Sequence, residues 1–477
     1  MTENKPNLIY LFADQLQLKA LGYAGNALAK TTFLDALAAI SVNMPNACSG
    51  HPLGGPYRAS LFTGKYSTST GMVMNALRIA PVHRTFAHIL HDNGYETAFI
   101  GKWNMYSAKL GRSHAVRDSF IPADENRLGF DDFFAAYDYH HYYYAPAAYY
   151  HTDSSEKRFA RGYEPDFQTD LAIEKLREYA DKKQPFAMFV SFGTPHDPWT
   201  KENVPAKYYE LFRDTDFPLP ENYSPKNDPH ADAWGRMNKK ERAMLPEWQR
   251  CYAAMTANLS DNVGRLYEAL KQTGLADDTI FVFTSDHGEM FGAHGRREKN
   301  IFYDEAVNVP FLIRYGDRLP AGVNLTPLNT VDILPTLMSL MNMKEDACFE
   351  GKDLSEAIRN GKQADNACLL MGTGPTAVWG ANREWRALRN DRFTYAVYRA
   401  DSEEFLFDNI EDPLQMHNLA SEPDCKPQLR ELKNKLFAEM ALIGDDFEPN
   451  VFYKKNWITR RMIRPVLPKR KDPGAKR

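Results

Sequence analysis

The chain has 477 residues, of which 43% are hydrophobic and 25% charged, and a formal net charge of −4 at pH 7. This ordinary balance shows no basic excess, so we expect no nucleic-acid partner, and no apolar run is long enough to span a bilayer, so we expect no membrane segment. Five cysteines without metal-finger spacing argue against a disulfide scaffold. The N-terminus lacks the zones of a signal peptide, which predicts a cytoplasmic protein, or a periplasmic or secreted one if a leader was removed.

Short β-rich runs alternate with helical patterns along most of the chain. This alternation predicts an α/β fold with a large, mostly parallel sheet sandwiched by helices. Because crossovers between parallel strands are right-handed, the carboxyl ends of the strands should share one edge. In chain order, the predicted strands are Asn7–Ala13, Glu96–Ile100, Pro185–Phe192, Thr279–Thr284 and Val309–Arg314, and the predicted helices are Thr32–Ile40, Arg58–Phe62, Thr85–Asp92, Phe167–Lys182, Leu245–Thr273 and Val331–Met341.

The pattern changes from about Asp365 onward. Short β segments there predict an antiparallel sheet, followed by a helix and a basic tail. We therefore predict an α/β domain over residues 1–364 and a smaller C-terminal α+β subdomain over residues 365–477. The predicted strands of the second part are Trp385–Arg389, Phe393–Tyr398 and Phe405–Asp408, and its predicted helix is Lys426–Ala441.

Polar clusters follow four of the predicted strands. In open α/β sheets, ligands bind outside the carboxyl ends of the strands, so these clusters are candidates to meet at one site. Taken singly, each is explained better by turn or helix-cap chemistry, at roughly two to one, but their recurrence at four strand ends shifts that balance. The clusters are Asp14-Gln15, Gly101-Lys102-Trp103-Asn104, Thr194-Pro195-His196-Asp197 and Asp286-His287-Gly288-Glu289.

Two of these clusters carry metal-ligand chemistry. Asp14, Gln15, Asp286 and His287 offer carboxylate, amide and imidazole groups to one divalent cation. The oxygen-rich set favours Ca²⁺, whereas the imidazole would also suit Mn²⁺ or Zn²⁺. A cation there would neutralise an anion and lower the pKa of a coordinated hydroxyl.

The loop HPLGGPYR precedes a helix that we predict to begin at Arg58. A helix N-terminus offers unpaired N–H groups and a partial positive charge to an anion. Arg58 in the first turn opposes that field, which makes sense if it neutralises an acidic group of the site. The alternative is a plain Gly-Pro loop with a surface arginine.

These segments resemble the formylglycine-dependent (type I) sulfatases of the alkaline phosphatase superfamily. The family signature is Cys or Ser, any residue, Pro, often Ser, then Arg, followed by small residues and Thr-Gly, and GGPYRASLFTG at residues 54–64 fits this frame. Further motifs extend the resemblance over about residues 6–420, in the family's order. They are Phe33-Leu34-Asp35, Gly101-Lys102-Trp103, Pro195-His196, Thr284 to Glu289 with Gly292 and His294-Gly295, Leu406-Phe407-Asp408, Asp412-Pro413 and Met416-His417-Asn418-Leu419.

The resemblance implies hydrolysis of a sulfate monoester, with a formylglycine gem-diol at position 54 as nucleophile and metal ligand. One hydroxyl would attack sulfur and the other would later expel sulfate. The sequence has Gly54 instead of Cys or Ser, and plain glycine can do neither. Three accounts stay open: Gly54 stands for a modified residue, it is an engineered change, or activity was lost naturally. The presence of the other site groups favours the first two.

Asn104 is a second departure, because the family usually has His at this position after Lys-Trp. Asn104 can hydrogen-bond but cannot serve as a base near neutral pH, so His51, His140 or His141 would take over, or proton handling differs. Gln15 replaces a second Asp of the family and removes one negative charge from the metal shell.

By the same resemblance, Lys102, His196 and Lys299 contact the sulfate, and Arg58 lies beside the nucleophile. Cations at the ester oxygens stabilise the charge that develops on the leaving group, and His196 or Lys299 could donate its proton. The aromatic and histidine-rich stretch Tyr137–Tyr144 is as consistent with a packed loop as with a substrate wall. The predicted substrate-binding residues are Asn104, His140, His141, Trp379 and Arg383.

Three functional hypotheses follow. The first is hydrolysis of a carbohydrate or aryl sulfate to an alcohol and inorganic sulfate, with one divalent cation, Ca²⁺ favoured, and a formylglycine-generating or anaerobic sulfatase-maturing enzyme as partner. The second is a phosphonate monoester or phosphodiester hydrolase of the same superfamily. The third is a catalytically inert protein that binds sulfate esters. Assays with aryl sulfate and aryl phosphonate separate the first two, and the mass of the position-54 peptide separates the third.

Overall fold

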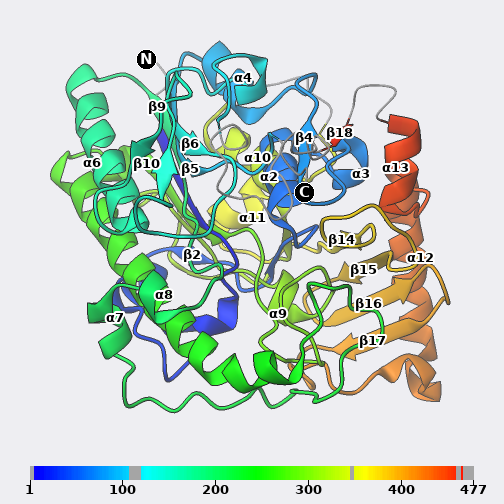
Figure 1. The fold of residues 1–477 in the computed structure, drawn as a ribbon. Helices are drawn as coiled ribbons and strands as arrows, with labels where there is room; N and C mark the ends of the chain where they lie inside the picture. The colour runs from blue at the N-terminus through cyan, green and yellow to red at the C-terminus, as the bar shows by residue number, and fades with distance from the viewer. Residues whose placement is uncertain (1–4, 107–119, 344–348, 458–462, 466–477) are drawn as a thin grey trace, which may run out of the picture.

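The computed structural model describes residues 5–106, 120–343, 349–457 and 463–465. Its larger part is built on an eight-stranded sheet in the order β12-β2-β11-β10-β1-β9-β5-β6 (Figure 1). The neighbours β10, β1, β9, β5 and β6 are parallel, and β11 is antiparallel to both of its neighbours. This confirms the predicted mostly parallel sheet. Its strands are β1 (Asn7–Ala13), β2 (Val42–Asn43), β5 (Glu96–Lys102), β6 (Phe133–Tyr137), β9 (Phe186–Ser191), β10 (Thr279–Ser285), β11 (Phe311–Arg314) and β12 (Gly322–Val323).

The central strand β1 shows why helices cover both faces of this sheet. Leu8, Tyr10 and Phe12 cluster on one side with α2, α4 and α10, whereas Ile9 and Leu11 cluster on the other with α1, α6 and α8. All five side chains are fully buried, as a strand covered on both faces requires. No helix among the described residues is long and apolar enough to cross a bilayer. The helices of this part are α1 (Thr32–Ala39), α2 (Gly54–Thr63), α3 (Ser67–Thr70), α4 (Phe86–Asp92), α6 (Glu164–Lys182), α7 (Ala206–Glu210), α8 (Lys239–Gln272), α9 (Asp304–Val307), α10 (Thr330–Leu340) and α11 (Ser355–Asn360).

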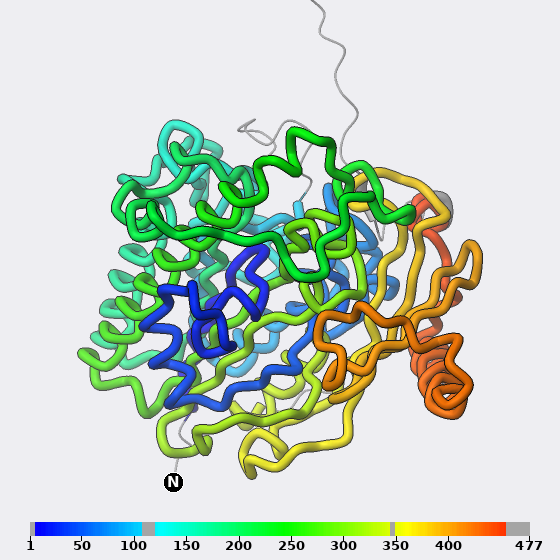
Figure 2. Tube along the Cα trace, turned by 90° about the horizontal axis from the view of Figure 1, so that it is seen from below, coloured from blue at the N-terminus to red at the C-terminus, as the bar shows by residue number. Residues whose placement is uncertain are grey.

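The second sheet is antiparallel and lies toward the C-terminus, against one flank of the α/β part (Figure 2). Its first strand, β14, escapes the sequence prediction because CLLMG is buried at every position and shows no alternation. Helix α12 packs on this sheet through Leu429, Leu432 and Leu436. The elements are β14 (Cys368–Gly372), β15 (Trp385–Arg389), β16 (Phe393–Tyr398), β17 (Glu404–Asp408), α12 (Lys426–Leu442) and α13 (Asn450–Trp457); the short pairs are β3 (Ala47–Cys48) with β13 (Leu328–Asn329), β4 (Leu77–Ile79) with β18 (Ile463–Pro465), and β7 (Tyr149–Tyr150) with β8 (Arg158–Phe159).

Helix α2 begins at Gly54, so the prediction that it begins at Arg58 is wrong. Pro56 is compatible with the earlier start, because the first N–H groups of a helix have no partner within the helix and a missing one costs nothing. Arg58 therefore lies one turn into α2, and its side chain is fully buried.

Candidate active site

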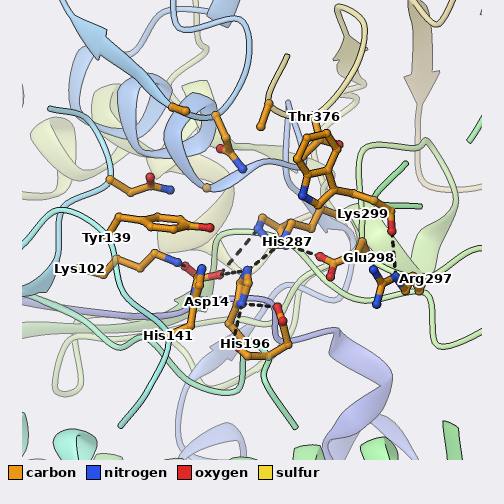
Figure 3. Close-up of a pocket in the computed structure, with 17 residues that line it drawn as sticks. Asp14, Lys102, Tyr139, His141, His196, His287, Arg297, Glu298, Lys299 and Thr376 are labelled. Atoms are coloured by element: carbon orange, nitrogen blue, oxygen red, sulfur yellow. Dashed lines mark hydrogen bonds and ion pairs between the residues drawn. The ribbon is translucent and has the colours of Figure 1, made fainter. Parts of the chain in front are cut away.

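Four neighbouring parallel strands bring the predicted polar clusters together. His287, Asp14, His196 and Lys102 stand at or just after the carboxyl ends of β10, β1, β9 and β5, and all four line one cavity of about 270 Å³ (Figure 3). The predicted residues that line it are Asp14, Gly54, Lys102, Asn104, His141, His196, His287 and Lys299. Lining residues that the sequence analysis does not assign to the site include Asn75, Tyr139, Trp234, Arg297, Glu298 and Thr376.

Arg58 lies behind the cavity and joins two carboxylates. Its Nη1 is 2.7 Å from Oδ2 of Asp286, and its Nη2 is 3.2 Å from Oδ2 of Asp14. Nζ of Lys102 is 2.6 Å from the same Asp14 oxygen. Burial acts to raise the pKa of Asp14, but the positive charges of Lys102 and Arg58 outweigh it and hold that pKa well below its usual value. Asp14 is therefore ionised at neutral pH.

Asp14, Asp286 and His287 form a group that fits a divalent cation. Each offers one ligand atom, and these atoms lie within 4.8 Å of one another. Oδ1 of Asp14 is buried without a hydrogen-bond partner, 3.8 Å from Nε2 of His287. Nδ1 of His287 is 3.1 Å from the carbonyl oxygen of Gly288, from which we assign the hydrogen to Nδ1 and a free lone pair to Nε2. Burial lowers the pKa of His287, so this ring is neutral and able to bind a metal.

The side chain of Gln15, the fourth predicted ligand, bridges two other groups. Its Oε1 accepts a hydrogen bond from Nζ of Lys299 at 2.6 Å, and its Nε2 donates to Oε2 of Glu289 at 2.5 Å. Its backbone N–H donates to Oδ1 of Asp286 at 2.9 Å. Gln15 thus touches the metal-ligand group through its main chain, while its amide oxygen faces Lys299.

His196 and Lys299 form a hydrogen-bonded pair on the cavity wall. Nε2 of His196 is 2.8 Å from Nζ of Lys299, and Nδ1 is 2.8 Å from Oδ1 of Asp197, so Nδ1 donates and Nε2 accepts. Burial, together with the charge of Lys299, lowers the pKa of His196 well below its usual value. Burial disfavours the charge on Lys299, but the carboxylates of Glu298 and Asp14 outweigh it and raise that pKa. The pair is a neutral imidazole with an ammonium group.

Gly54 faces the side chains of Asn104, Arg58 and Asp286. A Cβ atom at this position would lie 2.7 Å from Nδ2 of Asn104, 3.0 Å from Nη1 of Arg58 and 3.4 Å from Oδ2 of Asp286. The first distance is shorter than a van der Waals contact, so the amide of Asn104 fills the place where a side chain would begin. Formylglycine does not fit the chain as it stands, because glycine lacks the carbon that carries the hydroxyls and Asn104 would have to move.

His140 and His141 are adjacent in sequence but have different surroundings. His141 lines the cavity, and its ring stacks on that of His196 with centroids 4.1 Å apart. His140 stacks on Tyr137 instead and lies 3.1 Å from a carboxylate oxygen of Glu164. The structure therefore brings only His141 of this pair to the cavity.

Three other residues considered from the sequence do not line the cavity. Trp379 packs against the core cluster that includes α2, Arg383 donates to two backbone carbonyls in the segment before Trp234, and His51 contacts Oγ of Ser67 at 2.9 Å. Trp234 itself lines the cavity, and no motif in the sequence points to it.

Comparison with known proteins finds similar sequences over most of the chain. A family model described as Sulfatase matches residues 6–343, and one described as N-sulphoglucosamine sulphohydrolase, C-terminal, matches residues 292–441. The chain is 37% identical to the ulvan-active sulfatase of Formosa agariphila over 461 residues, which cover 95% of this chain and 84% of that protein. It is 25% identical to the N-acetylglucosamine-6-O-sulfatase of Bacteroides thetaiotaomicron, with 91% and 86% covered.

Solved structures share the fold. The protein yidJ of Bacteroides fragilis, described as a sulfatase, has a TM-score of 0.82 at 28% identity, covering 94% of this chain and 98% of that one. The phosphonate monoester hydrolase of Agrobacterium radiobacter has a TM-score of 0.72 at 22% identity, covering 92% and 96%. Because the Sulfatase model matches most of the chain and a relative is 37% identical over nearly all of it, the chain belongs to the sulfatase family of sulfuric ester hydrolases.

Proposed function

We propose that the cavity beside Gly54 binds the sulfate group of a carbohydrate or aryl sulfate monoester, the substrate class on which this family's hydrolytic activity acts. The observation that carries the proposal is the gathering of Lys102, Lys299 and His196 in one cavity with potential metal ligands. Charge-assisted hydrogen bonds from two ammonium groups suit a tetrahedral anion.

A carbohydrate is the form of the alcohol that we favour. Trp234 and Tyr139 supply aromatic surface to the cavity, and Asn75 and Thr376 supply polar groups, a combination that suits a sugar ring and its hydroxyls. The relatives named for ulvan and for N-acetylglucosamine 6-O-sulfate support the same class.

A divalent cation is part of the proposal. Asp14, Asp286 and His287 would hold it. The amide oxygen of Gln15 accepts a hydrogen bond from Lys299, so it would join these ligands only by releasing that lysine. Ca²⁺ suits the oxygen donors, and Mn²⁺ or Zn²⁺ suits the imidazole. When bound, the cation would neutralise negative charge on the sulfate oxygens.

Lys299 and His196 would act on the leaving oxygen. The raised pKa of Lys299 keeps its ammonium group charged, so it can stabilise the negative charge that develops on that oxygen. His196, neutral because burial and the charge of Lys299 lower its pKa, keeps Nε2 turned to this ammonium group and thereby orients it.

Hydrolysis by the family's formylglycine route requires more than Gly54 provides. We expect the chain with glycine at position 54 to bind a sulfate ester and to release it unchanged by that route. Cys or Ser at this position, oxidised by a formylglycine-generating or anaerobic sulfatase-maturing enzyme, would supply the missing group.

Titration calorimetry tests the proposal. The native chain should bind a sulfated monosaccharide and not its desulfated parent, and Lys102→Ala or Lys299→Ala should each cost about 1.5–3 kcal/mol, the range for a hydrogen bond to a charged group. Lys271→Ala, in an exposed ion pair on α8, is the matched control and should bind normally. Equal binding of both sugars, or an equal loss in the control, would refute the proposal. Tighter binding of an aryl phosphonate monoester would favour the phosphonate hydrolase alternative.

A further inference from the structure

Glu289 is a buried carboxylate next to the site that the proposed function leaves without a role. Its exposed fraction is 0%. Its Oε1 accepts hydrogen bonds from the backbone N–H groups of Phe291 and Glu298, at 3.0 and 2.8 Å, and its Oε2 accepts one from Nε2 of Gln15 at 2.5 Å. All three donors belong to uncharged amides. Burial raises the pKa of Glu289 to about 7, so its ionised form is costly to keep here, and its place between three amide donors needs an explanation.

The donor from Gln15 matters because a side-chain amide has two different ends. With Nε2 on Glu289, the oxygen must face the other way, where Nζ of Lys299 lies 2.6 Å from it. The reversed amide would set an oxygen against the Glu289 carboxylate and an NH₂ group against the ammonium of Lys299. Both contacts would be repulsive, so Glu289 and Lys299 select the same orientation. Glu298 favours it too, more weakly, since its Oε2 is 3.5 Å from the same Nε2.

The same carboxylate also holds the chain just before Lys299. Oε1 of Glu289 receives the N–H of Glu298, and the side chain of Glu298 is 3.0 Å from Nζ of Lys299. In turn, Nζ of Lys299 is 2.8 Å from Nε2 of His196 on the cavity wall. One buried group is therefore connected to a predicted metal ligand and to a sulfate-binding lysine.

We propose that Glu289 is a positioning residue, which fixes the amide of Gln15 with its oxygen toward Lys299 and the cavity. This rests on the proposed function, since the orientation matters for binding only if Gln15 ligates a cation or Lys299 holds a sulfate. Partners of this kind, which orient a metal ligand without touching the metal, commonly change metal affinity by about 10–100-fold.

The substitution Glu289→Gln tests the orientation with little change of shape. The new amide can keep its oxygen on the two backbone donors only by presenting its NH₂ to Gln15. The amide of Gln15 then either faces another NH₂ group or reverses and gives up its contact with Lys299. The double variant Gln15→Glu/Glu289→Gln exchanges the two groups. It restores one donor and one acceptor to this contact, with the NH₂ now at position 289, and leaves a carboxylate oxygen at position 15 to face Lys299. Glu305→Gln is the matched control, because Glu305 also accepts a hydrogen bond from a side-chain amide, that of Asn222 at 2.7 Å, but does not line the cavity.

Two titrations serve as readouts: Mn²⁺ binding, and inorganic sulfate binding in the presence of EDTA. Glu289→Gln should weaken Mn²⁺ binding about tenfold or more and should also weaken sulfate binding, at a melting temperature close to that of the native chain. The double variant should recover both affinities, and Glu305→Gln should leave both unchanged.

Native affinities in Glu289→Gln, or losses that the double variant does not recover, would overturn the positioning role. So would an equal loss in Glu305→Gln, which would indicate a general effect of neutralising a glutamate. If the native chain binds Mn²⁺ no better than Asp286→Ala does, the metal part of the proposed function fails instead, and the sulfate titration alone then decides the role of Glu289.

Discussion

At position 54, one missing carbon and one neighbouring amide decide what the site can do. Cβ of a cysteine there would lie 2.7 Å from Nδ2 of Asn104, so Gly54→Cys forces that amide aside. With a maturing enzyme present, we expect Gly54→Cys/Asn104→Ala to hydrolyse a chromogenic aryl sulfate faster than Gly54→Cys alone, and the native chain not at all. The mass of the position-54 peptide reports whether the aldehyde has formed. An aldehyde without hydrolysis in the double variant would contradict the formylglycine route.

Asp286 makes the shorter of the two contacts between Arg58 and the proposed metal ligands. Asp286→Ala removes a proposed metal ligand and leaves the buried Arg58 without its 2.7 Å partner, whereas Asp286→Asn keeps an acceptor for the guanidinium. Both should abolish Mn²⁺ and Ca²⁺ binding in calorimetry. Asp286→Ala should also lose about 3–5 kcal/mol of unfolding free energy, and Asp286→Asn clearly less. Full metal occupancy in either variant would show that Asp286 is not a ligand.

The sequence predicts the candidate site residues that lie at the ends of neighbouring parallel strands. It misses those whose position depends on the conformation of a loop. Asp14, Lys102 and His196 could be predicted because neighbouring parallel strands end at one edge. Trp234 could not, since it lies in a long loop without a motif. Whether His140 or His141 faces the cavity depends on the local turn of the chain, which no periodic pattern encodes.

Among the elements, the junction between β15 and the end of α12 offers a clear energetic test. Arg386 on β15 forms two hydrogen bonds with Asp445, at 2.5 and 2.9 Å, and both side chains are fully buried. Arg386→Ala leaves a buried carboxylate unpaired and should cost about 3–5 kcal/mol in urea unfolding. Arg399→Ala breaks the exposed pair with Glu448 and should cost less than about 1 kcal/mol. Equal losses would mean that burial of the ion pair does not affect its contribution to the free energy of unfolding.

The sequence predicts an element correctly where its local pattern is clear. Strands β15 and β16 have the predicted bounds. Strand β14 lacks alternation, and the start of α2 is hidden by Gly-Gly-Pro, a sequence that usually marks a loop. In both cases tertiary burial overrides the local signal.

For the whole molecule, histidines that are neutral in the folded state lower the free energy of unfolding as the pH falls. Burial lowers the pKa of His294 to about 4 and that of His51 to about 3. Since a histidine in the unfolded chain has a pKa near 6.5, the unfolded state binds more protons below this pH, and the free energy of unfolding falls as the pH falls. One such group accounts for about 2 kcal/mol between pH 6.5 and 5.

Urea unfolding at pH 7 and pH 5 measures this loss. His294→Gln should be less stable than the native chain at pH 7, because it gives up the stacking on Tyr303. It should, however, lose about 2 kcal/mol less between the two pH values. An identical loss in both proteins would show that His294 is not buried in the neutral form.

We propose above that the cavity beside Gly54 binds the sulfate group of an ester. A crystal structure of the native chain soaked with a sulfated monosaccharide and Mn²⁺ tests it most directly. We expect an intact ester with its sulfate within hydrogen-bond distance of Lys102 and Lys299 and next to the ring of His196, and a cation among Asp14, Asp286 and His287. An ordered sugar sulfate that binds elsewhere and leaves this cavity to solvent would show that the cavity is not a sulfate-ester site.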